Sequence, residues 1–174
     1  KRNLVCHEVS EHGDLERAFE ESDVVIDRVY ETQATEQSMM EPFSSYAYTD
    51  AQDRVCVVAS TQVPFHIRRQ VSIALQIPKS RVRIIKPRVG GGFGAKQSGC
   101  NEVYSAFCAY KLGHPCKCIY TREETMASGN TRHKVRMRVR LGAMNDGTIT
   151  AIDLYALSDA GAYGYHAPTT IGLV

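Results

Sequence analysis

The sequence predicts an α+β fold with two layers, in which helices pack on one face of a mixed β-sheet that contains hairpins. Apolar residues recur at helical spacing in two segments, 67–75 and 103–110. Strand-like runs stand before, between and after these helices, at 55–61, 82–89 and 116–120. Since 43% of the 174 residues are apolar, the chain can bury a core, and we expect residues 1–174 to be a single-domain segment of a longer subunit.

The N-terminal third is predicted to contain one short helix and three strands. The helix is capped by Asp14 and extends to residue 21, and a strand follows over residues 24–32. Residues 45–49 and 55–61 form a predicted hairpin, because a polar turn separates two runs rich in β-branched and aromatic residues.

The two longer helices are predicted from their apolar stripes. The first has Pro64 in its first turn and a stripe made of Ile67, Val71, Ala74 and Leu75. A strand over residues 82–89 then enters a glycine-rich loop. The second helix ends at Gly113, and its apolar face consists of Val103, Ala106, Phe107 and Tyr110.

The last third predicts a buried strand, a short helix and a long hairpin. The strand covers residues 116–120, and Thr121 and Glu124 have the spacing of a capping box for the helix. Residues 134–141 alternate between basic and apolar side chains, and an Asn-Asp-Gly turn leads into a return strand over 148–158. Residues 161–168 are predicted to be a loop.

Composition narrows the class of protein. No apolar run approaches the length of a membrane span and no signal peptide is visible, so we expect a cytoplasmic protein without membrane contact. The six cysteines lack metal-site spacing and are interpreted as buried free thiols. Residues 1–60 carry a net charge of −8 and residues 61–174 one of +10, which suits an anionic ligand. Nucleic acid is not expected, since no reader motif accompanies the charge.

The run Val89-Gly90-Gly91-Gly92-Phe93-Gly94-Ala95-Lys96-Gln97 is the main functional signal. A loop with so few side chains lets a ligand approach its backbone N–H groups, which can surround an oxygen or phosphate group. Lys96 would add a positive charge nearby. A phosphate-binding P-loop is excluded, because it needs Gly-Lys followed by Ser or Thr. The dinucleotide fingerprint fits Gly90, Gly92 and Ala95 by letters, but the preceding strand contains Lys86 and Pro87, which a central strand disfavours.

Several motifs together resemble the molybdenum hydroxylases, the xanthine oxidase and aldehyde oxidoreductase family. The resemblance covers most of the chain and is specific only as a set. Its parts are Met40-Glu41-Pro42, Ser60-Thr61-Gln62, the glycine loop, Ala109-Tyr110-Lys111-Leu112-Gly113-His114-Pro115 and Thr121-Arg122-Glu123-Glu124. The chain is similar to the front part of the molybdopterin-binding region of the large subunit.

The resemblance implies roles for particular residues. In the family, the glutamine matching Gln62 donates a hydrogen bond to an oxo ligand of molybdenum, and backbone N–H groups matching Phe93 and Gly94 approach the metal and the pterin. Gly91 and Gly92 belong to the same cofactor-binding loop. Such enzymes hydroxylate a carbon with oxygen derived from water, and their cofactor is molybdopterin, in some members as the cytosine dinucleotide form. Neutral, pre-aimed amide donors suit oxygen acceptors, while the cofactor supplies the redox chemistry.

Two departures limit the resemblance. Xanthine oxidases have a glutamate after the loop lysine, where it contacts the purine, whereas this chain has Gln97 in the expected substrate pocket. The substrate is therefore expected to be a purine, another nitrogen heterocycle or an aldehyde. No residue matches the family's catalytic glutamate, so no catalytic residue is assigned and the segment alone is expected to be inactive. No protein ligand to the metal is expected, because the pterin holds the molybdenum.

The expected partners are the remainder of the large subunit, iron–sulfur and FAD-binding domains or subunits, and a small-molecule substrate. Two alternatives remain at this point. One is a dinucleotide-binding dehydrogenase of the NAD type that uses the same loop. The other is a non-catalytic segment that docks another domain.

Overall fold

The computed structural model describes residues 3–162, 164 and 167–172, and the chain divides into two compact units. Unit 1 contains residues 1–35 and 132–174, and unit 2 contains residues 36–131. Both units combine strands with helices, so the predicted α+β class is confirmed. The strands belong to two sheets, one in each unit, where the sequence suggested one.

Unit 2 contains a four-stranded mixed sheet with the order β4-β3-β2-β5. Strands β2 (Ser44–Thr49) and β3 (Val55–Ala59) form the predicted antiparallel hairpin, and β5 (Cys116–Ile119) pairs antiparallel with β2. Strand β4 (Val82–Ile85) is parallel to β3, because helix α2 (Pro64–Leu75) and the 3-10 turn η1 (Lys79–Arg81) form the crossover between them.

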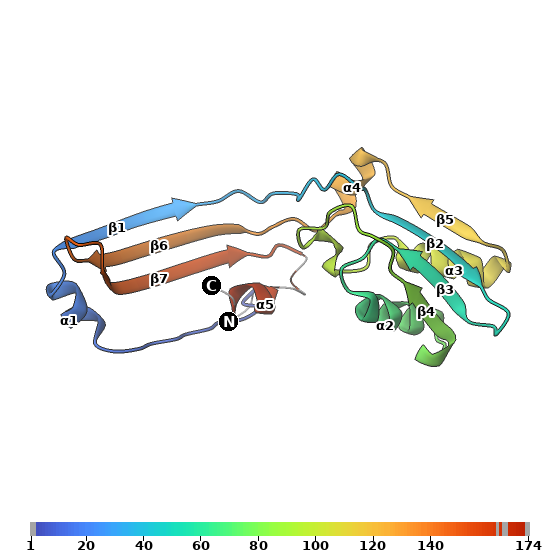
Figure 1. The fold of residues 1–174 in the computed structure, drawn as a ribbon, viewed down its shortest axis with the longest axis horizontal. Helices are drawn as coiled ribbons and strands as arrows, with labels where there is room; N and C mark the ends of the chain where they lie inside the picture. Colours follow the sequence, from blue (N-terminus) through green and yellow to red (C-terminus); the bar gives the residue numbers. More distant parts are fainter. Residues whose placement is uncertain (1–2, 163, 165–166, 173–174) are drawn as a thin grey trace. The chain divides into compact units, whose positions relative to one another are not determined.

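The core of unit 2 lies between this sheet and two helices, α2 and α3 (Glu102–Leu112) (Figure 1). Ile67, Val71 and Leu75 of the predicted stripe are buried, as expected. They pack with small and branched residues of the strands and of α3: Ala47, Val55, Val57, Ala59, Val82, Ala106 and Ala109. The helices therefore form one layer and the sheet forms the other.

Four local predictions differ from the structure of unit 2. Strand β4 ends at Ile85, four residues early, because Pro87 has no N–H for a strand ladder. Strand β5 is half-exposed and not buried, since it lies at the sheet edge. Phe107 is exposed, because α3 packs through small side chains such as Ala106 and Ala109, which allow a close approach to the sheet; Ala74 of α2 is also exposed.

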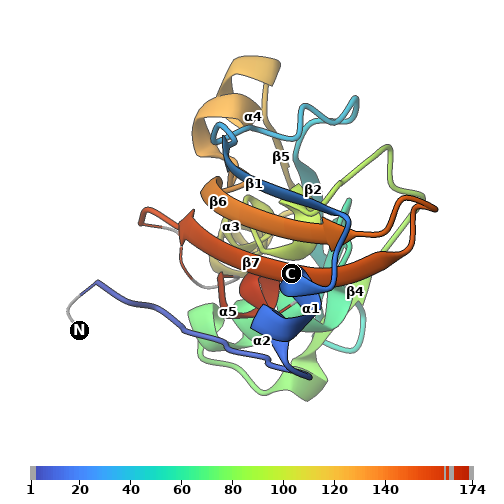
Figure 2. The ribbon, with the colours of Figure 1, turned by 90° about the vertical axis from the view of Figure 1, so that its left-hand side faces the viewer.

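Unit 1 contains a three-stranded antiparallel sheet with the order β1-β6-β7 (Figure 2). Strand β1 (Val24–Glu31) pairs with β6 (Lys134–Ala143), and β6 pairs with β7 (Ile149–Asp159). Gly147 forms the predicted turn between β6 and β7 with a φ of +90°. The basic face of β6 meets acidic side chains of β1, with 2.6 Å between Arg138 and Asp27.

The remaining helices are short. Helix α1 (Leu15–Glu20) is capped by Asp14 as predicted, and α4 (Arg122–Ser128) has the predicted capping box. Helix α5 (Ala167–Ile171) begins inside the predicted loop 161–168, of which residues 163, 165 and 166 lie outside the described residues. None of the described helices is long and apolar enough to cross a membrane.

Candidate functional site

The Ser-Thr-Gln segment lies where β3 ends and α2 begins, and its backbone is fixed by the loop that contains Lys96. The Gln62 N–H donates to the carbonyl oxygen of Lys96 at 2.9 Å, and the Thr61 hydroxyl donates to the same oxygen at 3.3 Å. Thr61 is fully buried and also accepts from the Val63 N–H at 3.1 Å. The exposed Gln62 side chain therefore extends from a backbone that is held in place.

The glycine loop has the backbone conformation that its composition predicts. Gly91 and Gly94 have φ angles of +99° and +93°, in the left-handed region that glycine adopts without cost. Phe93 also has a positive φ, +51°, which costs a residue with a side chain roughly 1–2 kcal/mol. A short 3-10 turn, η2 (Ala95–Gln97), ends the loop. Phe93 is 64% exposed as a residue, so burial of its side chain does not explain this conformation.

Gln62 contacts the glycine loop directly. Its Oε1 accepts a hydrogen bond from the Gly94 N–H at 3.0 Å. A Cβ atom at Gly92 would lie only 2.5 Å from the same oxygen, so the side chain of Gln62 occupies the space that this glycine leaves. The Gly94 N–H can donate only to the oxygen of the Gln62 side-chain amide, and this sets the orientation of that amide. The Nε2 group of Gln62 therefore faces away from Gly94 and can act as a donor.

Four hydrogen-bond donors at this position have no partner among the residues that the structure describes. They are Nε2 of Gln62 and the backbone N–H groups of Gly91, Gly92 and Phe93. Such groups bind either water or an oxygen-rich ligand. The donor set is uncharged and fits the oxygen atoms of a metallopterin. The predicted residues Gln62, Gly91, Gly92, Phe93 and Gly94 thus lie together.

Glu41 connects the glycine loop to the Ser-Thr-Gln segment through its side chain. Its Oε2 accepts from Ser60 Oγ at 2.5 Å, from the Gly90 N–H at 2.7 Å and from Lys96 Nζ at 2.8 Å. The Lys96 ammonium also donates to Ser60 Oγ at 2.9 Å. We call these three side chains the Glu41–Lys96–Ser60 cluster.

The charges of this cluster balance within the protein. Burial raises the pKa of Glu41, but hydrogen bonds from Lys96, Ser60 and the Gly90 N–H outweigh burial and lower the pKa below its usual value of 4.5. Glu41 is therefore a carboxylate at neutral pH. The Lys96 side chain is only 1% exposed and pairs with this carboxylate, so it does not present the positive charge to a ligand that the sequence suggested.

Gln97 and Gly91 complete the predicted set. Gln97 lies at the end of η2, is half-buried, and its N–H donates to the Gly94 carbonyl at 3.2 Å. A Cβ atom at Gly91 would lie 3.2 Å from Cβ of Met39, which is fully buried beneath the loop. The contact of Gln97 with substrate stays a prediction.

The local chain path disfavours the dinucleotide-binding alternative. Such a site needs a central strand that leads through the glycine turn directly into a helix, whose N-terminus meets the pyrophosphate. Here β4 is an edge strand that ends five residues before Gly90, and α3 begins only at Glu102. The loop ends in the short turn η2 instead.

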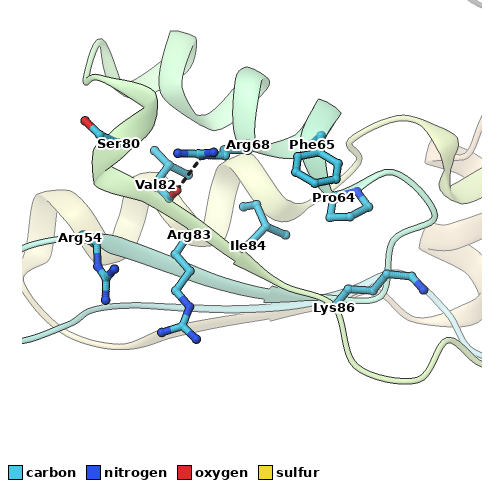
Figure 3. Close-up of a pocket in the computed structure, with 9 residues that line it drawn as sticks. All are labelled: Arg54, Pro64, Phe65, Arg68, Ser80, Val82, Arg83, Ile84 and Lys86. Carbon is cyan, nitrogen blue, oxygen red and sulfur yellow. Dashed lines mark hydrogen bonds between the residues drawn. The ribbon is translucent and has the colours of Figure 1, made fainter.

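A cavity of about 430 Å³ lies at the edge of unit 2, between β4 and the start of α2 (Figure 3). Its lining is basic and includes Arg54, Arg68, Arg83 and Lys86. The Arg68 guanidinium donates to the carbonyl oxygens of Lys79 and Val82, and Arg54 pairs with Asp50. None of the predicted cofactor-binding residues lines this cavity, so we do not assign it to the site.

The cysteines and acidic residues of the described ranges form no metal centre. All six cysteines are free, as expected, but only Cys56 is fully buried and Cys108 is exposed, which corrects the expectation that all were core residues. Within the described part of the chain, no group of three or more His, Cys, Asp or Glu residues could hold a metal ion.

Comparison with known proteins gives consistent results. Residues 1–173 match the family of the molybdopterin cofactor-binding domain. The probable hypoxanthine oxidase XdhD of Escherichia coli O157:H7 is 36% identical over 97% of this chain and 18% of its own length. The nicotinate dehydrogenase large molybdopterin subunit of Eubacterium barkeri is 34% identical over 92% of this chain and 38% of its own length. The chain therefore spans less than two fifths of either relative.

Solved structures share the fold. The aldehyde oxidoreductase of Desulfovibrio gigas superimposes with a TM-score of 0.76 at 21% identity, over 88% of this chain and 17% of that protein. The reconstituted CO dehydrogenase of Oligotropha carboxidovorans superimposes with a TM-score of 0.68 at 26% identity, over 83% of this chain and 18% of that protein. The chain belongs to the molybdopterin cofactor-binding domain family of xanthine dehydrogenase and aldehyde oxidoreductase proteins.

Proposed function

We propose that this chain supplies one wall of the cofactor site in a molybdenum hydroxylase. The observation that carries the proposal is the contact between Gln62 and the glycine loop. In this contact Oε1 accepts from the Gly94 N–H, while Nε2 and the N–H groups of residues 91–93 have no partner among the described residues. A neutral row of donors next to a side-chain-poor loop suits a ligand with several oxygen acceptors.

The chemistry of the whole enzyme follows from this role. When bound, the molybdenum cofactor supplies a redox centre that accepts two electrons as a substrate C–H group and water become C–OH and two protons. The residues of this chain bind and orient: Gln62 donates from Nε2, and the loop N–H groups donate to further oxygen atoms of the cofactor. Neutral donors need no change of protonation during turnover. The general base lies in the remainder of the large subunit.

The substrate is a purine, another nitrogen heterocycle or an aldehyde. Gln97 offers both a donor and an acceptor, and therefore matches a heterocycle that presents a ring nitrogen beside a carbonyl group. The named activities of the relatives, hypoxanthine oxidase and nicotinate dehydrogenase, are in line with a heterocycle. Electrons leave through iron–sulfur and FAD-binding domains or subunits.

Two finer points belong to the same proposal. We place the enzyme in the cytoplasm, since six unpaired cysteines suit a reducing compartment. The pterin carries either no nucleotide or a cytosine nucleotide, and acid hydrolysis of the extracted cofactor separates these forms, because only the second releases cytidine monophosphate.

The test compares the complete wild-type protein with Gln62→Glu. This substitution keeps an oxygen for the Gly94 N–H but replaces the Nε2 donor by an acceptor with a negative charge. We expect the molybdenum content to fall, and kcat of the enzyme that retains metal to fall about 100-fold, as for loss of one preorganised donor. The matched control is Gln33→Glu at an exposed position in unit 1. Absence of molybdenum and pterin from the active wild-type protein would refute the proposal.

A further inference from the structure

We propose that the Glu41–Lys96–Ser60 cluster is a positioning device, which holds both ends of the glycine loop against the Ser-Thr-Gln segment so that Gln62 faces the cofactor. This inference rests on the proposed function. It concerns residues that act through Gln62 and the loop, and none of the three side chains is assigned a contact with the cofactor.

The geometry of one oxygen atom carries the inference. Oε2 of Glu41 accepts from Gly90 at the start of the loop, from Lys96 at its end and from Ser60 two residues before Gln62. Two of these donors belong to the glycine loop and the third to the Ser-Thr-Gln segment, and the acceptor lies on a separate stretch of the chain. A single carboxylate oxygen therefore determines how far the loop ends lie from each other and from Gln62.

Backbone hydrogen bonds reinforce the same arrangement. The Glu41 N–H donates to the Gly90 carbonyl at 3.1 Å, so these two residues bind each other in both directions. The Lys96 carbonyl accepts from Gln62 and Thr61, as described above. Residues 91–95 lie between these two attachment points and contain the unpartnered N–H groups.

Burial shows why this pair determines geometry more than it adds net stability. The Lys96 side chain is 1% exposed and its partner Glu41 is 32% exposed. Removing an ammonium group from water is costly, and a buried ion pair does little more than offset that cost. The pair is instead sensitive to the loss of one partner, because an uncompensated buried charge must move, become neutral or draw in water.

This sensitivity predicts an asymmetry between two substitutions. Glu41→Gln leaves the buried Lys96 ammonium without a counter-charge. Lys96→Met leaves Glu41 partly exposed to solvent, with Ser60 and the Gly90 N–H still donating to it. The double variant Glu41→Gln/Lys96→Met removes both charges, so it should be less perturbed than Glu41→Gln alone.

Hydrogen–deuterium exchange of the complete protein, followed at the hydrogen-bonded amides of Gly90 and Gly94, tests this order. We expect exchange to accelerate about 100-fold in Glu41→Gln and about 10-fold in Lys96→Met, with the double variant below Glu41→Gln. Molybdenum content per subunit should fall in the same order, and kcat should fall more than KM rises. The matched controls are Glu31→Gln, in an exposed pair 3.5 Å from Arg136, and Lys134→Met on the exposed end of β6.

The outcomes separate this inference from the proposed function. If the loop amides exchange as slowly in Glu41→Gln as in the control Glu31→Gln, the inference is overturned, whatever the metal content. Faster exchange with unchanged molybdenum content and kcat would also overturn it. Wild-type protein without molybdenum would instead refute the proposed function. If Glu41→Gln does not fold, the comparison of Lys96→Met with the double variant decides, because both lack the uncompensated ammonium.

Discussion

Substitution of Gly92 by alanine separates the function of the loop from its stability. A Cβ atom at Gly92 would lie 2.5, 2.8 and 3.1 Å from Oε1, Cδ and Cγ of Gln62. Gly92 has no positive φ, so the backbone poses no left-handed strain to alanine, and the three atoms nearest to the added Cβ all belong to Gln62. We expect the Gln62 side chain to turn away and its hydrogen bond with the Gly94 N–H to break.

The expected change in the free energy of unfolding follows from the loss of the hydrogen bond between Gln62 and the Gly94 N–H. A neutral, partly exposed hydrogen bond contributes about 0.5–1.5 kcal/mol. Replacing glycine by alanine at an allowed backbone conformation returns about 0.4–1 kcal/mol through the unfolded state. The net change in the free energy of unfolding should therefore stay below about 1 kcal/mol. The cofactor, in contrast, loses a donor whose position depended on the broken bond.

The assay measures molybdenum per subunit, kcat and the exchange rate of the Gly94 amide in the complete protein. We expect Gly92→Ala to accelerate that exchange about 10-fold and to lower both molybdenum content and kcat. Gly147→Ala is the control, because Gly147 has a φ of +90° and open space around it, so this variant should be less stable but keep its cofactor. Full molybdenum content and unchanged kcat in Gly92→Ala would refute the reasoning.

Two further predictions concern titratable groups. The pKa of Glu41 is lowered in the folded protein, so the stabilisation by its carboxylate is present above pH 4.5 and is lost as the pH falls through the lower folded pKa. The difference in amide exchange between wild type and Glu41→Gln should therefore shrink below about pH 4.5. A difference that stays constant from pH 7 to pH 3 would contradict this. Burial raises the pKa of the Cys100 thiol to about 11, so iodoacetamide at pH 7 should label the exposed Cys108 first by mass spectrometry, and equal labelling rates would show that Cys100 is open to solvent.

Local signals predicted the secondary structure well. The capping box at Thr121 and Glu124 consists of two bonds between residues three apart, so its formation depends on little else. The stripe of α2 was equally readable, since Ile67, Val71 and Leu75 share one face by helical geometry alone. Predictions that depended on contacts between separate helices and strands succeeded less often. The exposure of Phe107 depends on how closely α3 approaches the sheet, and spacing along one helix does not report that distance.

Sequence reasoning proposed the residues of the candidate site but not the contacts between them. Composition identified the glycine loop, and the resemblance to a family selected Gln62. Neither showed that Gly92 must lack a side chain because Gln62 lies against it. Neither showed that Lys96 is directed inward to Glu41, since a lysine in a glycine-rich loop usually suggests a ligand contact. The available signal was that both residues belong to motifs that resemble the same family.

The discontinuity of unit 1 has a consequence for biosynthesis. Strand β1 pairs with β6, which follows only after all of unit 2 has been synthesised. During translation, residues 24–31 therefore emerge as a strand whose backbone N–H and C=O groups lack the ladder partner that β6 later supplies. Unit 2, whose segment is continuous, can fold on the ribosome before that sheet closes. Nascent chains halted once residue 131 has left the ribosomal exit tunnel should consequently need a chaperone for the N-terminal strand while the loop and Gln62 are already assembled.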